Sequence, residues 1–172
     1  MATNQIYLRN LLLLLCALAL AACGFHLRGM TQMSFKTLYI QKSGAPSLLR
    51  DLQRSLTSSG VTVVAKPEEA EMLLELMQEK TDKRILSLSG GGKVREYELV
   101  YSIVLRMRSA ASELWSEPQT IELRRDFSYS DSELLAKEGE EARLYSSMRS
   151  DATREIMRRL SVLQAGAPAA QP

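Results

Sequence analysis

The sequence predicts one domain of mixed α/β (α+β) class, with a mostly antiparallel sheet of four to five strands and two helices. Three observations predict it. Apolar and polar residues alternate over residues 94–107, which is typical of a strand with one buried face. Two strand-like runs flank the glycines at positions 90–92, so a hairpin is expected to join them. Apolar residues recur at helical spacing over residues 145–163, which predicts a helix long enough to cover a sheet.

The N-terminal part of this domain is predicted to hold a strand, a helix and a second, brief strand. Residues 35–41 alternate between apolar and polar types, which indicates a half-buried strand. Pro46 suits the first turn of a helix, and this helix is expected to end at Gly60. Its apolar stripe consists of Leu48, Leu49, Leu52 and Leu56. The β-branched residues that follow at 61–64 predict a short strand.

A longer but less regular strand is predicted over residues 74–88. Leu74 and Leu76 begin an alternating run, which is lost over the polar stretch 78–84 and returns at Ile85. The interruption predicts a bulge or an edge position. The glycines that follow lack the GxGxxG or Walker spacing of a nucleotide-binding loop, and no helix is predicted directly after them. We therefore interpret them as a hairpin tip.

The strand over residues 94–107 is the most regular of the chain, and a turn near residues 110–113 leads to a further strand over residues 115–127. Trp115 and Phe127 are interpreted as core residues of that strand. A long helix follows, with capping side chains before it and an apolar stripe along it. The stripe consists of Tyr145, Met148, Ala152, Ile156, Leu160 and Leu163. The small residues and prolines at 165–172 predict a disordered tail.

Residues 1–22 are predicted to be a lipoprotein signal peptide, and residues 23–34 a lipidated tether to the domain at residues 35–164. The apolar run that ends at Ala22 is too short to span a bilayer, which needs about 20 residues. Small residues precede Cys23, and this arrangement resembles a bacterial lipoprotein signal. The resemblance implies an N-acyl and S-diacylglycerol lipid on Cys23, and Gly24 after it implies the periplasmic side of the outer membrane. The alternative is an ordinary cleaved signal followed by a free thiol.

Composition argues against several classes of function. Removal of Arg9 with the signal changes 22 basic residues to 21, against 20 acidic ones, so the side-chain balance of +1 gives no support for nucleic-acid binding. The mature chain keeps one cysteine, assigned to the lipid, and one histidine, His26, close to it. This supply predicts no metal site, no nucleophile and no cofactor apart from the lipid. An enzyme is therefore not expected.

Five basic residues are predicted to meet at one rim of the sheet. In a meander, the end of one strand, the start of the next and the end of the third coincide, so residues 90–95 should lie beside residues 125–137. The residues gathered there are Lys93, Arg95, Arg124, Arg125 and Lys137. Their side chains could bind phosphates while apolar neighbours contact acyl chains. Solubilising charge at loop ends is the alternative interpretation.

Residues 23–29, which read Cys-Gly-Phe-His-Leu-Arg-Gly, resemble the start of mature members of the LPS-assembly lipoprotein LptE family, also called rare lipoprotein B. The order of elements is similar along the rest of the chain. The resemblance implies a two-layer sandwich with both helices packed on one face of the sheet. It also implies that basic residues near the hairpin tip and the last helix bind lipopolysaccharide. Lys137 matches the helix position, and either Lys93 or Arg95 matches the tip.

The function implied by the resemblance is that of a non-enzymatic, lipid-anchored protein of the outer membrane. Such a protein plugs and helps to assemble an LptD-type β-barrel, and assists the insertion of lipopolysaccharide into the outer leaflet. The expected partners are therefore the barrel, lipopolysaccharide and the membrane, without nucleic acid. The alternative is a lipoprotein that serves as a substrate-binding or pilot module of another envelope transport complex.

Overall fold

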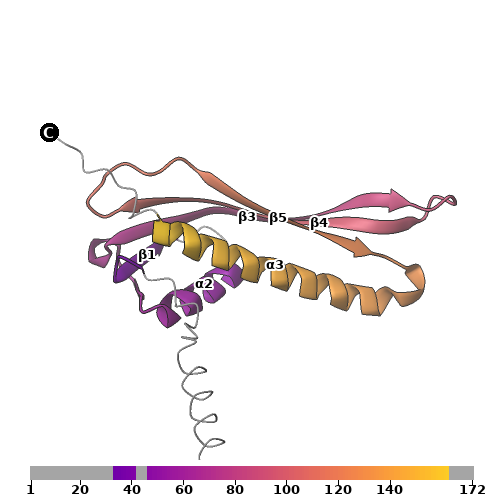
Figure 1. Cartoon of the computed structure of the whole chain (residues 1–172), viewed down its shortest axis with the longest axis horizontal. Coiled ribbons are helices and arrows are strands. Elements are labelled where there is room, and N and C mark those ends of the chain that lie inside the picture. The colour runs from indigo at the N-terminus through magenta and orange to yellow at the C-terminus, as the bar shows by residue number, and fades with distance from the viewer. Residues whose placement is uncertain (1–32, 42–45, 163–172) are drawn as a thin grey trace, which may run out of the picture. The chain divides into compact units, whose positions relative to one another are not determined.

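The computed structural model describes residues 33–41 and 46–162 of the chain. The predicted signal peptide, Cys23, most of the predicted tether and the predicted tail lie outside these residues. The described residues form one five-stranded sheet, and both helices among them pack on the same face of that sheet (Figure 1). This arrangement confirms the predicted two-layer α/β fold.

The order of strands and helices along the described chain is the predicted one. The elements are β1 (Thr37–Gln41), α2 (Pro46–Ser58), β2 (Thr62–Val64), β3 (Met72–Leu88), β4 (Val94–Ser109), β5 (Gln119–Ser128) and α3 (Leu134–Val162). Short 3-10 turns at Pro67–Glu69 and Asp131–Glu133 precede β3 and α3.

The strands lie in the order β2-β1-β3-β4-β5 across the sheet. β1 pairs in parallel with both β2 and β3, because a helix and a turn carry the chain back between them. The long ladders β3–β4 and β4–β5 are antiparallel. Parallel pairing is thus confined to the ladders of the two short strands, and the sheet is mostly antiparallel as predicted.

The hydrophobic core fills the space between the sheet and the two helices. Both predicted helical stripes are buried, and so is one face of β4, because residues repeated at the period of each element share one side of it. The buried residues are Leu48, Leu52 and Leu56 of α2, Met148, Ala152, Ile156 and Leu160 of α3, and Leu99, Tyr101, Ile103, Leu105 and Met107 of β4. Two stripe residues, Leu49 and Tyr145, are only half-buried and pack against this core, while Leu163 lies outside the described residues.

The last strand is shorter than predicted. β5 begins at Gln119 rather than at Trp115, because Pro118 has no N–H group to donate to a ladder. Phe127 is buried, as predicted, but Trp115 lies in the connection between β4 and β5. The guanidinium carbons of Arg106 and Arg108 lie 4.8 and 5.3 Å from the centroid of a Trp115 ring. Trp115 therefore stacks on cationic side chains and is not part of the core cluster.

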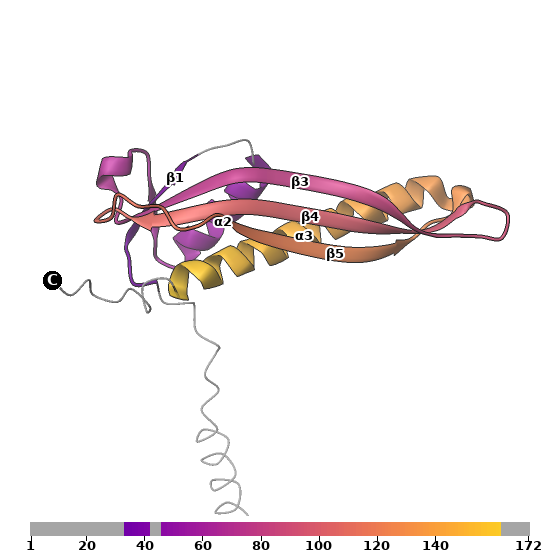
Figure 2. The same ribbon diagram turned by 90° about the horizontal axis from the view of Figure 1, so that it is seen from above.

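β3 and β4 form a hairpin that continues past the end of β5 (Figure 2). Ser128, the last residue of β5, pairs with Glu96, so only β3 and β4 continue beyond this point, and we call the end of their hairpin, residues 85–96, the hairpin arm. The turn at its tip contains Gly92 at a φ of 76°, a conformation that suits glycine. Register shifts in β3 fall between Leu76 and Gln78 and again after Ile85, which confirms the predicted bulge. The end of the sheet that carries the arm is called the distal end below.

Candidate functional site

A pocket of about 500 Å³ lies at the distal end, between the sheet and the first turns of α3. It forms where β5 has ended and the chain crosses from the sheet layer to the helix layer. Aromatic, basic and acidic side chains line it together. The lining residues are Lys83, Tyr97, Tyr129, Leu134, Lys137, Glu138, Glu141, Ala142 and Tyr145.

The face of α3 that covers the sheet changes character in this pocket. Lys137, Glu141 and Tyr145 are spaced by four residues, so they lie on one side of the helix. The same side continues into the buried Met148 and Ala152. The stripe that is apolar over the core is thus charged over the pocket, so the N-terminal end of α3 presents charged side chains to it.

Lys137, a predicted site residue, lies in the first turn of α3, where several partners contact its side chain. Its ammonium group donates hydrogen bonds to Ser128 Oγ at 3.2 Å and to Glu140 Oε2 at 2.9 Å. It also lies 5.6 Å from the centroid of the Phe127 ring. The Lys137 side chain is only 14% exposed. It is therefore a positioned cation, unlike a solvated lysine at the end of a loop.

Lys93 and Arg95 both belong to the hairpin arm. The backbone N–H of Lys93 donates to Ser89 Oγ at 3.1 Å, which fixes the turn at the tip. The carbonyl of Arg95 accepts a hydrogen bond of 2.8 Å from the N–H of Tyr129, in the segment that leads from β5 to α3. The structure thus brings Arg95 beside the entrance to α3, as the meander argument predicts, and places Lys93 two residues further out along the arm.

Arg124 and Arg125 do not reach this rim, although the sequence argument places them there. Arg124 pairs with Val100 and Arg125 with Leu99 in the β4–β5 ladder, several residues before β5 ends. Neighbouring residues of a strand point to opposite faces, so these two side chains also diverge. A ligand role for either residue stays a prediction. In the structure, each of the two side chains forms ion pairs with different partners.

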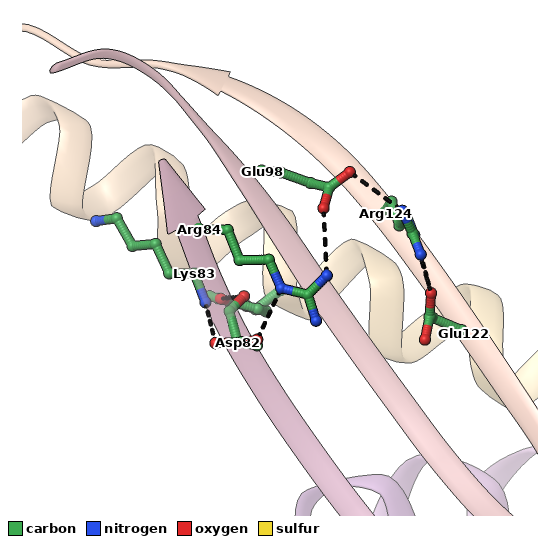
Figure 3. Close-up of polar contacts among 7 residues, drawn as sticks. Asp82, Lys83, Arg84, Glu98, Glu122 and Arg124 are labelled. Atoms are coloured by element: carbon green, nitrogen blue, oxygen red, sulfur yellow. Dashed lines mark hydrogen bonds and ion pairs between the residues drawn. The ribbon is translucent and has the colours of Figure 1, made fainter. Parts of the chain in front are cut away.

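The side chain of Arg124 belongs to an ion-pair ladder on the helix-free face of the sheet (Figure 3). Its guanidinium lies 2.6 Å from Glu122 and 3.5 Å from Glu98, and the hydrogen bond to Glu122 raises the pKa of Arg124. Arg84 continues the ladder from Glu98 to Asp82, and its hydrogen bond lowers the pKa of that carboxyl. Arg125 instead faces the helices, where it lies 2.6 Å from Asp151 of α3.

Lys83 is the site residue that the sequence argument misses. It pairs with the buried Leu99 in the β3–β4 ladder, so its side chain lies on the helix side of the sheet, opposite to the ladder of Figure 3. Its ammonium group donates a hydrogen bond of 2.6 Å to Glu141 Oε2. The bulge after Leu76 resets the alternation, so that Glu79, Thr81 and Lys83 face α3. Counting from the bulge would have shown this.

Aromatic rings surround the Lys83 ammonium group on the sheet side. It lies 4.3 Å from the centroid of the Tyr97 ring, 5.6 Å from that of Phe127 and 5.7 Å from that of Tyr129. A cation is attracted to the faces of such rings. Tyr145 closes the opposite side, where its hydroxyl donates a 2.8 Å hydrogen bond to the carbonyl of Asp82. Burial and the nearby Glu141 and Asp82 carboxylates raise the pKa of Tyr145 further above its ordinary value.

Large apolar side chains are exposed next to these cations. Ile85 is 59% exposed and Leu135 is 83% exposed, and they belong to the hairpin arm and the first turn of α3. Leu86, Leu88 and Leu134 are also exposed in these segments. Exposed apolar patches on a protein surface mark binding sites for apolar partners. The distal end thus offers cations and apolar surface together, which suits an anionic amphiphile.

A larger pocket, of about 910 Å³, lies at the opposite edge of the sheet, along β1, β2 and α2. Residues such as Gln53, Thr57 and Val63 line it, and its walls carry no charged side chain among the described residues. It lacks the features that recognise a charged ligand.

Over residues 33–41 and 46–162, no cluster of three or more metal-ligating side chains is found, and no helix is long and apolar enough to cross a membrane.

Sequence comparisons relate the chain to proteins of lipopolysaccharide assembly. Residues 35–160 match the family model described as LptE: Lipopolysaccharide-assembly. The chain is 30% identical over 159 residues to the LPS-assembly lipoprotein LptE of Yersinia enterocolitica, which covers 90% of this chain and 76% of that protein. It is also 30% identical over 154 residues to the LPS-assembly lipoprotein LptE of Photorhabdus laumondii, with 88% and 84% covered.

Solved structures share the fold. The solution NMR structure of an uncharacterized lipoprotein B from Nitrosomonas europaea superposes with a TM-score of 0.73 at 37% identity, and covers 83% of this chain and 94% of that one. The crystal structure of the rare lipoprotein B from Shewanella oneidensis gives a TM-score of 0.68 at 27% identity, with 76% and 97% covered. The two-layer arrangement is therefore common to these lipoproteins and to this chain.

Proposed function

Because the chain belongs to the LptE family of lipopolysaccharide-assembly proteins, we propose that it is a non-enzymatic outer-membrane lipoprotein that helps to insert lipopolysaccharide into the outer leaflet. The observation that carries this proposal is the family match over residues 35–160, which spans nearly the whole described domain. In this role the protein plugs and helps to assemble an LptD-like β-barrel.

The helix-free face of the sheet supports the plug role. It carries the ladder of Asp82, Arg84, Glu98, Arg124 and Glu122, whose charges are paired with one another. The lumen of a membrane β-barrel is polar, so a surface of paired charges can lie against it without burying an unpaired ion.

The membrane anchor in this proposal is the lipid on Cys23, with residues 23–34 as the tether and the domain on the periplasmic side. One acyl chain gives only marginal membrane binding, whereas the diacylglyceryl group and the N-acyl chain together give stable attachment. The boundaries at residues 22, 34 and 164 remain predictions of the sequence.

The lipopolysaccharide site of this proposal is the distal end. Lys137 and the arm residues Lys93 and Arg95 supply cations for phosphates, and Ile85, Leu86 and Leu88 supply the apolar surface for acyl chains. Arg124 and Arg125 are not needed in this arrangement, since Arg124 is paired with Glu122 of β5 and Arg125 with Asp151 of α3.

Co-purification from outer membranes tests the proposal. A tagged full-length chain should recover an LptD-like β-barrel together with lipopolysaccharide. Recovery of a secretin or of an inner-membrane transporter in place of the barrel would instead support a pilot or substrate-binding module of another envelope complex.

A further inference from the structure

We propose that Lys83 and Glu141 form a phosphate site that the protein's own carboxylate occupies until ligand arrives. In this arrangement, a phosphate of a phosphorylated glycolipid headgroup displaces Glu141 and takes the Lys83 ammonium group in its place. The inference rests on the proposed function, and it adds a ligand residue and a competing carboxylate to the distal site.

Four elements fix the position of Lys83, which distinguishes it from a solvated surface lysine. β3 directs the side chain toward α3, β4 and β5 supply the Tyr97 and Phe127 rings, and α3 supplies Glu141 at 2.6 Å. The Lys83 and Glu141 side chains are 32% and 24% exposed, so the ion pair stands at the border of solvent. An anion can reach it without unfolding the domain.

A second lysine–carboxylate pair lies beside the first. Lys137 is bound to Glu140, the residue next to Glu141 in α3, and the ammonium groups of Lys83 and Lys137 each lie 5.6 Å from the Phe127 ring centroid. Both lysines line the same pocket. With the carboxylates in place the two cations are compensated, so the pocket does not hold uncompensated positive charge in the absence of ligand.

In this site a ligand phosphate replaces the Glu141 carboxylate on Lys83, and this exchange suits a ligand that is bound only transiently. A phosphate carries more charge and more acceptor oxygens than a carboxylate, so it competes for the ammonium group. The displaced Glu141, however, must return to solvent, which limits the affinity. Glu141 thereby sets how easily the ligand is released, as a protein that passes its ligand on requires.

The dimensions of the pocket point to the headgroup as its occupant. A volume of about 500 Å³ lies in the range of small-molecule sites, and the rings of Tyr97, Tyr129 and Tyr145 wall it. Flat rings of this kind pack against a sugar ring, whereas the exposed leucine and isoleucine side chains of the hairpin arm lie outside the pocket. The acyl chains are therefore assigned to the arm and the phosphorylated sugar to the pocket.

The test uses the full-length lipidated chain in detergent, titrated with lipopolysaccharide and with the same lipopolysaccharide after chemical dephosphorylation. Lys83→Met should weaken binding to the phosphorylated form about tenfold, because a charge-assisted hydrogen bond is lost. Glu141→Gln should strengthen it about threefold or more, because the competing carboxylate is gone. Neither variant should differ from the wild type toward the dephosphorylated form.

Glu155→Gln is the matched control. It makes the same chemical change in α3, about 21 Å along the helix, and also frees arginines, because Glu155 binds Arg158 at 2.6 Å and Arg159 at 2.8 Å. Its affinity should stay within about twofold of the wild type, since the net-charge change alone acts weakly at that distance. An equal gain in Glu155→Gln and Glu141→Gln would overturn the inference in favour of a general charge effect.

Further outcomes separate this inference from the proposed function. If the wild-type chain binds lipopolysaccharide and Lys83→Met binds it equally well, Lys83 only supports the fold and the inference is wrong. If the wild type binds no lipopolysaccharide, the proposed function fails instead. Should Lys83→Met unfold, Glu141→Gln decides alone, because misfolding does not raise affinity. Competition by inorganic pyrophosphate as strong as by lipopolysaccharide would also overturn the assignment, since the site would then bind phosphate without its sugar.

Discussion

The hydroxyl of Tyr101 on β4 donates a hydrogen bond of 2.5 Å to Glu79 Oε1 on β3. The two residues lie on the side of the sheet that faces α3, where Tyr101 is buried and Glu79 is half-buried. Burial, followed by the hydrogen bond and the charge of Glu79, raises the pKa of Tyr101. A charged carboxylate next to the core is thereby satisfied by a neutral phenol, which makes the stability of the domain sensitive to both groups.

Replacement of Tyr101 by Phe should lower the free energy of unfolding by about 1 to 3 kcal/mol at pH 8, because Glu79 loses this hydrogen bond. The raised pKa stabilises the folded state fully below the phenol's unfolded pKa of about 10, and this contribution is lost as the pH rises above that value. The difference between wild type and variant should therefore shrink between pH 9 and pH 11. Urea denaturation across that range measures it, and a constant difference would contradict the assignment.

Leu105 tests the buried face of β4. The side chain is fully buried, so Leu105→Ala should cost about 2 to 5 kcal/mol. Glu98 is the control on the opposite face, where it lies 3.5 Å from Arg124 within the ion-pair ladder, and Glu98→Ala should cost less than about 1 kcal/mol. Chemical denaturation of both variants at neutral pH compares them. Losses of equal size would mean that the helix-free face contributes to the core.

Cys23→Ala should abolish attachment to the outer membrane. Without its lipid, the mature sequence offers no apolar run of about 20 residues that could anchor it. Fractionation should be done in cells that lack the barrel partner, so that binding to the barrel cannot retain the chain. The prediction fails if the variant still sediments with outer membranes under those conditions.

The cations of the distal end are tested by the double variant Lys93→Gln, Lys137→Gln. Lipopolysaccharide affinity should fall about tenfold or more, and the fall should be larger at low salt, because screening weakens charge interactions. Glutamine is preferred to glutamate at position 137, because the Lys137 ammonium group lies 2.9 Å from Glu140 and a second carboxylate there would be repelled by it. Titration at two salt concentrations provides the measurement.

Arg158→Gln, Arg159→Gln serves as the control for that double variant. These arginines lie near the C-terminal end of α3, where both contact Glu155. They remove the same amount of charge far from the distal end, so the affinity should hardly change. An equal fall in both double variants would reduce the distal cations to solubilising charge.

Much of the fold followed from the sequence because it depends on local periodicity. The alternation of Tyr97, Leu99 and Tyr101 is repeated within β4 itself, and the spacing of Met148, Ala152 and Ile156 is repeated within α3, so each element carries the signal of its own buried face. The hairpin tip was predictable for the same reason, since a run of glycines between two strands specifies a turn. Lys137 could also be placed, as a residue at the start of a predicted helix.

Other features depend on which residues of different elements face each other, and only the tertiary structure decided these. The bulge after Leu76 directs the Lys83 side chain toward α3. The register of the β4–β5 ladder places Arg125 opposite Leu99 and in contact with Asp151. Trp115 lies outside the strand, where it stacks on arginine side chains. Each of these features depends on contacts between residues far apart in the chain. The local periodicity of the sequence carries no information about such contacts. The sequence by itself determined the elements and their buried faces, whereas the pairing of Lys83 with Glu141 arose from the packing of a sheet against a helix 58 residues away.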